Sequence, residues 1–124
     1  MNRVYLIDSH ILIWSALGDP RLSPKHAKIL TSASVLFVSV ASIWEIEIKL
    51  KAGRLNLPSN FADVLADGHF DVLAISASHA LNAARLPLHH RDPFDRMLVA
   101  QAQSEGLTIL SADARIKAYQ ADVV

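Results

Sequence analysis

The chain has 124 residues, contains no cysteine, and carries 12 basic and 12 acidic side chains, which give a formal net charge of zero. This length predicts one domain over residues 1–124. The lack of cysteine excludes disulfides and thiolate metal sites and suits a cytoplasmic protein. Because nucleic-acid-binding proteins usually show a basic excess, an RNA-binding protein of this composition would need a bound cation and a few local arginines.

Apolar residues make up 52% of the chain, a high share for so small a domain. We therefore expect part of the apolar surface to stay exposed and to meet a partner, most simply a second copy in a two-fold homodimer. The alternative is an unusually aliphatic core. No apolar run reaches the roughly 18 residues of a membrane span, so we expect no membrane association.

Short apolar runs alternate with helical segments along the chain. In chain order the sequence predicts a strand at 4–7, helices at 10–17 and 24–33, a strand at 35–40, helices at 41–53 and 61–68, a strand at 72–75, helices at 76–86 and 93–106, a strand at 107–110, a helix at 111–120 and a last short strand. Continuous apolar strands that alternate with helices are typical of parallel sheets covered on both faces. The predicted fold is an α/β protein, a three-layer α/β/α sandwich with a mainly parallel central sheet.

Four carboxylates are expected at one edge of this sheet. Asp8 directly follows the first strand, Asp113 comes just after the strand at 107–110, and Glu45 lies near the start of the helix after the second strand. Asp95 is in the first turn of the helix that leads back into 107–110, so it faces the same edge. Ligands of parallel α/β sheets sit beyond the carboxyl ends of the strands, so the four acids are candidate site residues.

Each of these acids also has a purely structural interpretation as a helix cap. Asp8 and Asp113 could cap the helices that follow them. Ser42 and Glu45 match the spacing of a capping box, and Asp95 lies where a second capping carboxylate belongs. Gathered together, however, carboxylates repel one another and raise one another's pKa. A divalent cation relieves that repulsion, and oxygen ligands favour Mg²⁺ or Mn²⁺ over Zn²⁺.

Three segments carry a resemblance to a known family over nearly the whole chain. YLIDSHILIW, SVASIWEIEIKLKAGRL and LPLHHRDPFDRMLVAQAQSEGLTILSAD resemble the acidic blocks of PIN-domain ribonucleases, in particular the VapC-type toxins of bacterial toxin–antitoxin pairs. The resemblance implies a PIN-like fold, Mg²⁺-dependent cleavage of RNA, with Mn²⁺ as a plausible substitute, and control by a cognate antitoxin. It identifies the four acids of the site as Asp8, Glu45, Asp95 and Asp113.

On this interpretation the bound metal activates a water molecule that attacks the phosphodiester bond. Asp8 and Asp95 are expected as the inner metal ligands. Glu45 and Asp113 are expected to complete the site directly or through water, or to hold a second ion. Either one or two ions are compatible with this set.

Four further residues are secondary candidates. Ser9 and Ser111, where many relatives have threonine, could orient a ligand carboxylate or water, or could cap helices. Asp92 fits the N-cap of the helix at 93–106 better than a ligand position. Arg96 could contact a phosphate of the substrate or pair with a nearby acid.

An antitoxin segment lying across the acidic edge would need an apolar anchor and a basic side chain near Asp8 and Asp95. Trp14 and Trp44 are candidate anchor contacts and are otherwise expected in the core or at an interface. His10 is expected to pack within the first helix.

The sequence also allows functions other than a metal-dependent nuclease. The adjacent His89 and His90 could cleave RNA without metal, one as base and one as acid, although neighbouring loop side chains more often point apart. A non-catalytic interaction module would use the acids as caps and the apolar excess as an interface. A phosphotransfer domain with a phosphorylated Asp8 is disfavoured, because Ile7 and Ser9 flank that residue and the strand at 107–110 is followed by no nearby lysine.

Overall fold

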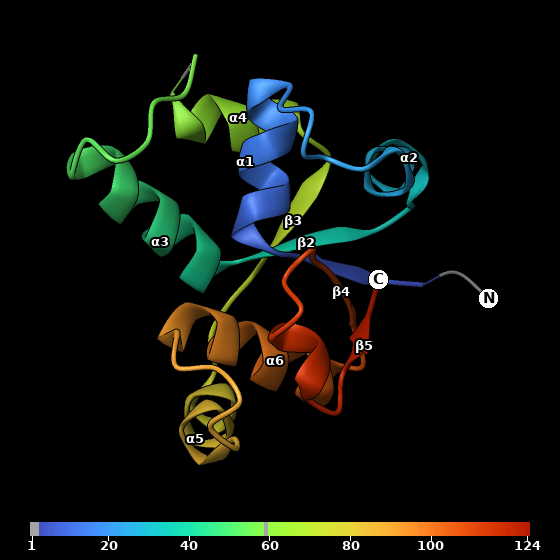
Figure 1. Ribbon diagram of the computed structural model, residues 1–124, viewed down its shortest axis with the longest axis vertical. Coiled ribbons are helices and arrows are strands. Elements are labelled where there is room, and N and C mark those ends of the chain that lie inside the picture. Colours follow the sequence, from blue (N-terminus) through green and yellow to red (C-terminus); the bar gives the residue numbers. More distant parts are fainter. Residues whose placement is uncertain (1–2, 59) are drawn as a thin grey trace.

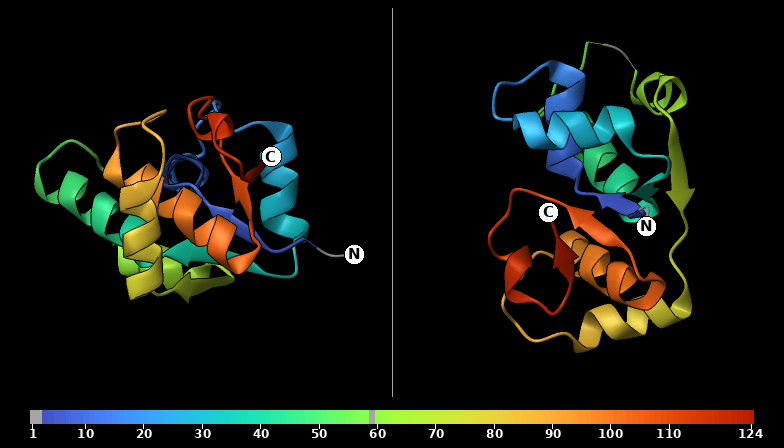
Figure 2. Two further views of the ribbon diagram at one scale, coloured as in Figure 1. Left: turned by 90° about the horizontal axis from the view of Figure 1, so that it is seen from below. Right: turned by 90° about the vertical axis from the view of Figure 1, so that its right-hand side faces the viewer.

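The computed structural model describes residues 3–58 and 60–124. Helices cover both faces of a five-stranded sheet, with α1 to α4 on one face and α5 and α6 on the other (Figures 1 and 2). The strand order is β3-β2-β1-β4-β5, and all four neighbouring pairs are parallel. The predicted α/β/α sandwich with a parallel central sheet is therefore confirmed.

The secondary structure begins and ends as follows. The strands are β1 (Tyr5–Ile7), β2 (Leu36–Ser39), β3 (Phe70–Leu73), β4 (Thr108–Leu110) and β5 (Asp122–Val123). The helices are α1 (Ser9–Leu17), α2 (Pro24–Ser32), α3 (Val40–Lys51), α4 (Phe61–Asp67), α5 (Ala77–Arg85) and α6 (Pro93–Glu105), and η1 (Ile116–Ala118) is a short 3₁₀ helix. Within the described ranges, no helix has the length and apolarity needed to cross a membrane.

The central strand β1 contributes to the apolar core on both faces of the sheet. Ile7 packs with α1 and α3 on one face, whereas Leu6 packs with α6 on the other, and both side chains are fully buried. Successive side chains of a strand point to opposite faces, so a strand covered on both sides must be apolar at every position. This explains the unbroken apolar run before Asp8.

Two helices differ from the sequence-based expectation. The helix expected at 111–120 is reduced to η1, because the Asp113 side chain accepts a hydrogen bond of 2.9 Å from the backbone N–H of Arg115 and offers the chain a local turn instead. Helix α3 begins at Val40, where the Ser39 hydroxyl accepts from the backbone N–H of Ala41 at 3.0 Å.

The earlier start of α3 rules out one structural interpretation of an acid. A capping box of Ser42 and Glu45 would need Ser42 at the N-cap, but the N-cap is Ser39, so that expectation is wrong. Glu45 instead lies in the second turn of α3, where the backbone N–H groups are already bonded within the helix.

Candidate active site

The ends of the two central strands bring the first acid of the site against Ser111. Asp8 leaves β1 with its backbone N–H bonded to the Leu110 carbonyl at 3.0 Å. The Ser111 hydroxyl then donates to Asp8 Oδ2 at 2.7 Å and accepts from the backbone N–H of Asp113 at 3.0 Å. Asp8 also caps α1, accepting from the backbone N–H of His10 at 3.4 Å. Capping therefore occupies one of its oxygens, and Ser111 orients the other.

The Ser9 hydroxyl joins Asp8 to Glu45. It donates to Glu45 Oε1 at 2.7 Å and lies 3.4 Å from Asp8 Oδ1. The other carboxylate oxygen of Glu45 lies 3.3 Å from Lys49 Nζ, one helical turn further along α3. Asp8, Ser9 and Glu45 are all at most 5% exposed, so this buried group is held by the hydroxyls of Ser9 and Ser111 and the ammonium group of Lys49.

The other two acids, Asp95 and Asp113, lie close together beside the start of α6. The Asp92 side chain caps this helix, accepting from the backbone N–H groups of Phe94 at 2.8 Å and Asp95 at 3.3 Å. Asp92 therefore has the capping role expected for it. His90 Nε2 lies 2.7 Å from Asp95 Oδ2 and 3.5 Å from Asp113 Oδ2. The ligand atoms of His90, Asp95 and Asp113 all lie within 4.8 Å of one another, a spacing that suits a bound metal ion.

Electrostatics link the two groups of acids. Burial, and then the negative charges of Asp8 and Asp92, raise the pKa of Asp95 from its usual 3.8 to about 7. Burial alone would raise the pKa of Asp8 as well, but hydrogen bonds from His10 and Ser111 hold it below its usual value. Burial likewise opposes the effect of Arg115, which lowers the pKa of Asp113. Asp95 is thus a buried carboxyl group that lacks enough positive charge nearby, which is the condition a divalent cation corrects.

A hollow on the side of α1 reaches two of the four acids, Asp8 and Asp113. A hollow of about 220 Å³ is lined by Asp8, His10, Trp14, Ala112, Asp113 and Arg115. His10 lies in the first helix as expected, with its ring 6.1 Å from that of Trp14, but it is exposed and its Nδ1 lies 3.7 Å from Asp8 Oδ1. Arg115 is exposed and lies 3.2 Å from Asp113 Oδ2. Both basic side chains border the hollow, so positive charge is available where a phosphate could enter.

Arg96 does not have the phosphate contact expected from its position beside Asp95. Its side chain is buried, and its guanidinium donates to the carbonyl oxygens of Ala83 and Leu86 at 2.9 Å each and of Pro87 at 3.0 Å. The arginine thus fastens the segment between α5 and α6. The sequence does not distinguish a buried from an exposed arginine beside an acid, so the burial of Arg96 was not predictable. For Arg115, the only signal in the sequence is its position two residues after Asp113.

The two histidines of the alternative, metal-free mechanism lie in different surroundings. His89 is exposed, with its ring 5.0 Å from the ring of Tyr119, whereas His90 is buried against Asp95. A base and an acid that act on one phosphodiester must both reach it. This arrangement does not pair them, and the contact of His90 with the acids is a feature of the site that the sequence did not indicate.

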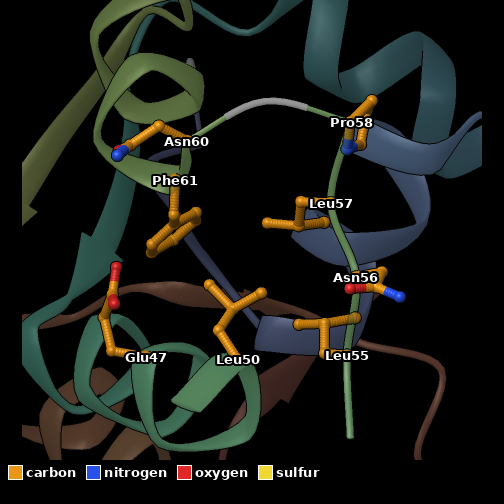
Figure 3. Close-up of a pocket in the computed structure, with 8 residues that line it drawn as sticks. All are labelled: Glu47, Leu50, Leu55, Asn56, Leu57, Pro58, Asn60 and Phe61. Carbon is orange, nitrogen blue, oxygen red and sulfur yellow. The ribbon is translucent and has the colours of Figure 1, made fainter. Parts of the chain in front are cut away.

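A larger hollow lies beside α3 and the start of α4 (Figure 3). It measures about 430 Å³ and is lined by Glu47, Leu50, Leu55, Asn56, Leu57, Pro58, Asn60 and Phe61. Apolar side chains predominate in this lining, and Glu47 is its single carboxylate. The hollow therefore offers no group of metal ligands comparable to the acidic site.

The chain matches a known protein family over most of its length. Residues 5–122 match the PIN domain. The chain belongs to the PIN-domain family. The resemblance noted in the three acidic segments is confirmed, and within this PIN domain all four acids lie at the carboxyl edge of the sheet.

Individual relatives agree with this assignment. Ribonuclease VapC22 of Mycobacterium tuberculosis is 28% identical over 119 residues, which cover 93% of this chain and 91% of that protein. VapBC2 from Rickettsia felis, solved bound to a promoter DNA fragment, has a TM-score of 0.72 at 11% identity and covers 98% of this PIN domain and 97% of that chain. VapC20 of Mycobacterium tuberculosis, a sarcin-ricin loop cleaving toxin, has a TM-score of 0.69 at 16% identity, covering 94% and 95%. The two structural matches support the fold.

Proposed function

We propose that this PIN domain is a metal-dependent endoribonuclease that acts as the toxin of a toxin–antitoxin pair. The observation that carries the proposal is the convergence of four carboxylates, Asp8, Glu45, Asp95 and Asp113, at one edge of the sheet. The likeness to a ribonuclease supports RNA as the substrate, and the likeness to proteins solved as toxin–antitoxin complexes supports the role of a toxin.

A non-catalytic module that uses the acids only as helix caps fits the contacts less well. Asp8 and Asp92 do cap helices. Among residues 3–58 and 60–124, however, no backbone N–H donates to the side chain of Glu45 or Asp95. Burying carboxylates without such bonds is unfavourable unless another partner holds them. Glu45 already has Ser9 and Lys49 as partners, whereas Asp95 has only His90 beside it, so a cation is the simplest further partner for Asp95.

We assign the cation as Mg²⁺, with Mn²⁺ as a substitute, because the donors are carboxylate oxygens. Asp8 and Asp95 would be its inner ligands, and Glu45 and Asp113 would complete the site directly, through water, or around a second ion. When bound, the cation supplies positive charge to a phosphate oxygen and makes an attacking water more acidic. The chain's own task is to hold the carboxylates in place.

The hydroxyl groups of Ser9 and Ser111 hold two of the carboxylates in place. Ser9 and Ser111 donate to Glu45 and Asp8 at 2.7 Å each, so one oxygen of each carboxylate is fixed. Lys49 holds the second oxygen of Glu45. Arg115, exposed at the mouth of the hollow, is positioned to meet the RNA backbone in the role first considered for Arg96.

Two surfaces suit the proposed protein partners. The acidic hollow, with Trp14 in its lining, would accept an antitoxin segment that brings an Arg or Lys near Asp8 and Asp95. A third hollow, of about 300 Å³, is apolar and is lined by Ala41, Trp44, Ile75, Pro93, Phe94 and Met97. Trp44 is 63% exposed there and meets Phe94 edge-on at 5.6 Å. We assign the homodimer contact to this apolar face.

RNA cleavage by matched variants tests the proposal. Wild-type protein with Mg²⁺ should cut RNA internally, and Asp95→Asn should lose at least about 100-fold in rate, because it removes a charged ligand. Asp63→Asn is the control, since Asp63 is also an acid in the first turn of a helix but is exposed. Equal cleavage by all three proteins would contradict the assignment of Asp95 as a metal ligand. If no neighbouring gene product suppresses cleavage, the proposal of a cognate antitoxin is contradicted.

A further inference from the structure

The side chains of Arg96 and Tyr119 both form hydrogen bonds to the segment that carries His90. Arg96 binds carbonyl oxygens along it, as described above. The Tyr119 hydroxyl donates to the Pro87 carbonyl at 2.7 Å and accepts from the backbone N–H of His90 at 3.0 Å. Arg96 Nη1 also lies 3.3 Å from the Tyr119 hydroxyl. These bonds fix the backbone of His90 although it lies between two helices and not within one.

The bond at one ring nitrogen of His90 decides what the other nitrogen can do. Nδ1 accepts from the backbone N–H of Asp92 at 3.3 Å. A neutral imidazole has one donor and one acceptor nitrogen, so the ring proton belongs on Nε2. Nε2 therefore faces Asp95 and Asp113 as a donor and not with a free lone pair.

The Nε2 donor has no well-aligned acceptor in the described part of the chain. The His90 side chain is 4% exposed, and the oxygens at 2.7 Å and 3.5 Å lie off the direction of the N–H bond. A buried donor left in this state is unfavourable. Hydrogen bonds of active sites are often poorly aligned in the free protein and tighten when the ligand is bound. The imidazole is thus directed into the site and incompletely bonded.

We propose that His90 is a positioning residue of the metal site, whose Nε2–H donor holds the carboxylates of Asp95 and Asp113 together for a divalent cation. Arg96 and Tyr119 in turn hold His90. The inference rests on the proposed function, because it requires a cation at these acids. Residues that hydrogen-bond the ligands of a metal typically change its affinity by about 10- to 100-fold, so the effect is large enough to measure.

Mn²⁺ binding followed by electron paramagnetic resonance tests the proposal without any activity assay. His90→Leu removes the donor and should weaken Mn²⁺ binding about 10- to 100-fold, whereas His90→Gln keeps an N–H donor and should restore most of the affinity. Tyr119→Phe removes the bonds to Pro87 and His90 and should fall between wild type and His90→Leu. His89→Gln is the matched control and should bind like wild type, because His89 is exposed.

The outcomes separate this inference from the proposed function. Wild-type protein that binds no Mn²⁺ would overturn both. Binding that is unchanged in His90→Leu would overturn the role of His90 alone. Hyperfine coupling of Mn²⁺ to an imidazole nitrogen, lost in His90→Leu, would identify His90 as a direct ligand and contradict the donor role. If His90→Leu fails to fold by circular dichroism, the comparison of Tyr119→Phe with wild type decides, and equal affinities contradict the proposal.

Discussion

The Ser111 hydroxyl donates to Asp8 Oδ2 at 2.7 Å across 103 positions of sequence. The two residues meet because β1 and β4 are parallel neighbours with Ile7 opposite Leu110, so each residue leaves the sheet one step beyond a paired position. Ser111 also accepts from the backbone N–H of Asp113. One hydroxyl therefore sets the positions of two of the acids, and the rest of the site is built outward from this contact.

Neutralising an acid of the site should abolish cleavage. We predict that Asp8→Asn and Asp95→Asn both lose RNA cleavage. Metal-free Asp95→Asn should melt at the same temperature as wild type or higher, because the raised pKa of Asp95 means that its charge is unfavourable in the folded protein. Metal-free Asp8→Asn should melt at the same temperature or lower, because the lowered pKa of Asp8 means that its charge is stabilised there. Thermal melting and RNase assays on the same preparations check this, and full activity in both variants would end the ligand assignment.

The raised pKa of Asp95 should make the metal-free protein less stable as pH rises. Burial, and then the charges of Asp8 and Asp92, raise this pKa from 3.8 to about 7. Between these values the folded protein keeps a proton that the unfolded chain releases, so a higher pH favours unfolding. The free energy of unfolding should therefore fall from about pH 4 to about pH 7, and Asp95→Asn should show a smaller fall.

Other titrating groups do not cancel this difference. The pKa values of Asp8 and Asp113 are lowered, so their opposite effect lies below the usual carboxyl range and outside the window. The pKa of His10 is raised through its bond to Asp8, which adds a fall of the same sign in both proteins. Urea unfolding in EDTA across the pH range measures the slopes, and identical slopes for wild type and Asp95→Asn would contradict the prediction.

Arg96 should matter for stability in a way that an exposed arginine does not. Arg96→Met leaves the carbonyls of Ala83, Leu86 and Pro87 without their buried donor, and we expect a loss of about 2–4 kcal/mol. Arg91→Met is the control, because Arg91 lies in the same segment but is exposed, and it should change stability by less than about 0.5 kcal/mol. Equal urea midpoints for the two variants would show that the network does not hold this segment.

The apolar face around Trp44 should set the oligomeric state. We predict a dimer at micromolar concentration by light scattering and a shift towards monomer in Trp44→Ser, because aromatic side chains often dominate interface energies. Leu88→Ser is the control, since Leu88 is 78% exposed but does not line that hollow. A wild-type monomer at high concentration, or equal dissociation in both variants, would remove this assignment.

The positions of Asp8 and Asp113 were predictable because each comes within a few residues of the end of a mainly apolar strand, and the carboxyl ends of strands in a parallel sheet lie at one edge. The contact of His90 with Asp95 and the burial of Arg96 were not, because both depend on how the segment after α5 folds back against α6 and Tyr119. The helix expected around Asp113 failed for a local reason. The same carboxylate that faces His90 also bonds the backbone of Arg115, and that turn competes with a helix.

Analysis of the product ends with and without EDTA shows whether RNA cleavage depends on a cation held by the four acids. With Mg²⁺ or Mn²⁺ the fragments should carry 5′-phosphate and 3′-hydroxyl ends, as expected when water attacks the phosphodiester. EDTA should stop cleavage, and added Mg²⁺ should restore it. Cleavage that survives EDTA and leaves 2′,3′-cyclic phosphate ends would contradict the account and return the chemistry to His89 and His90.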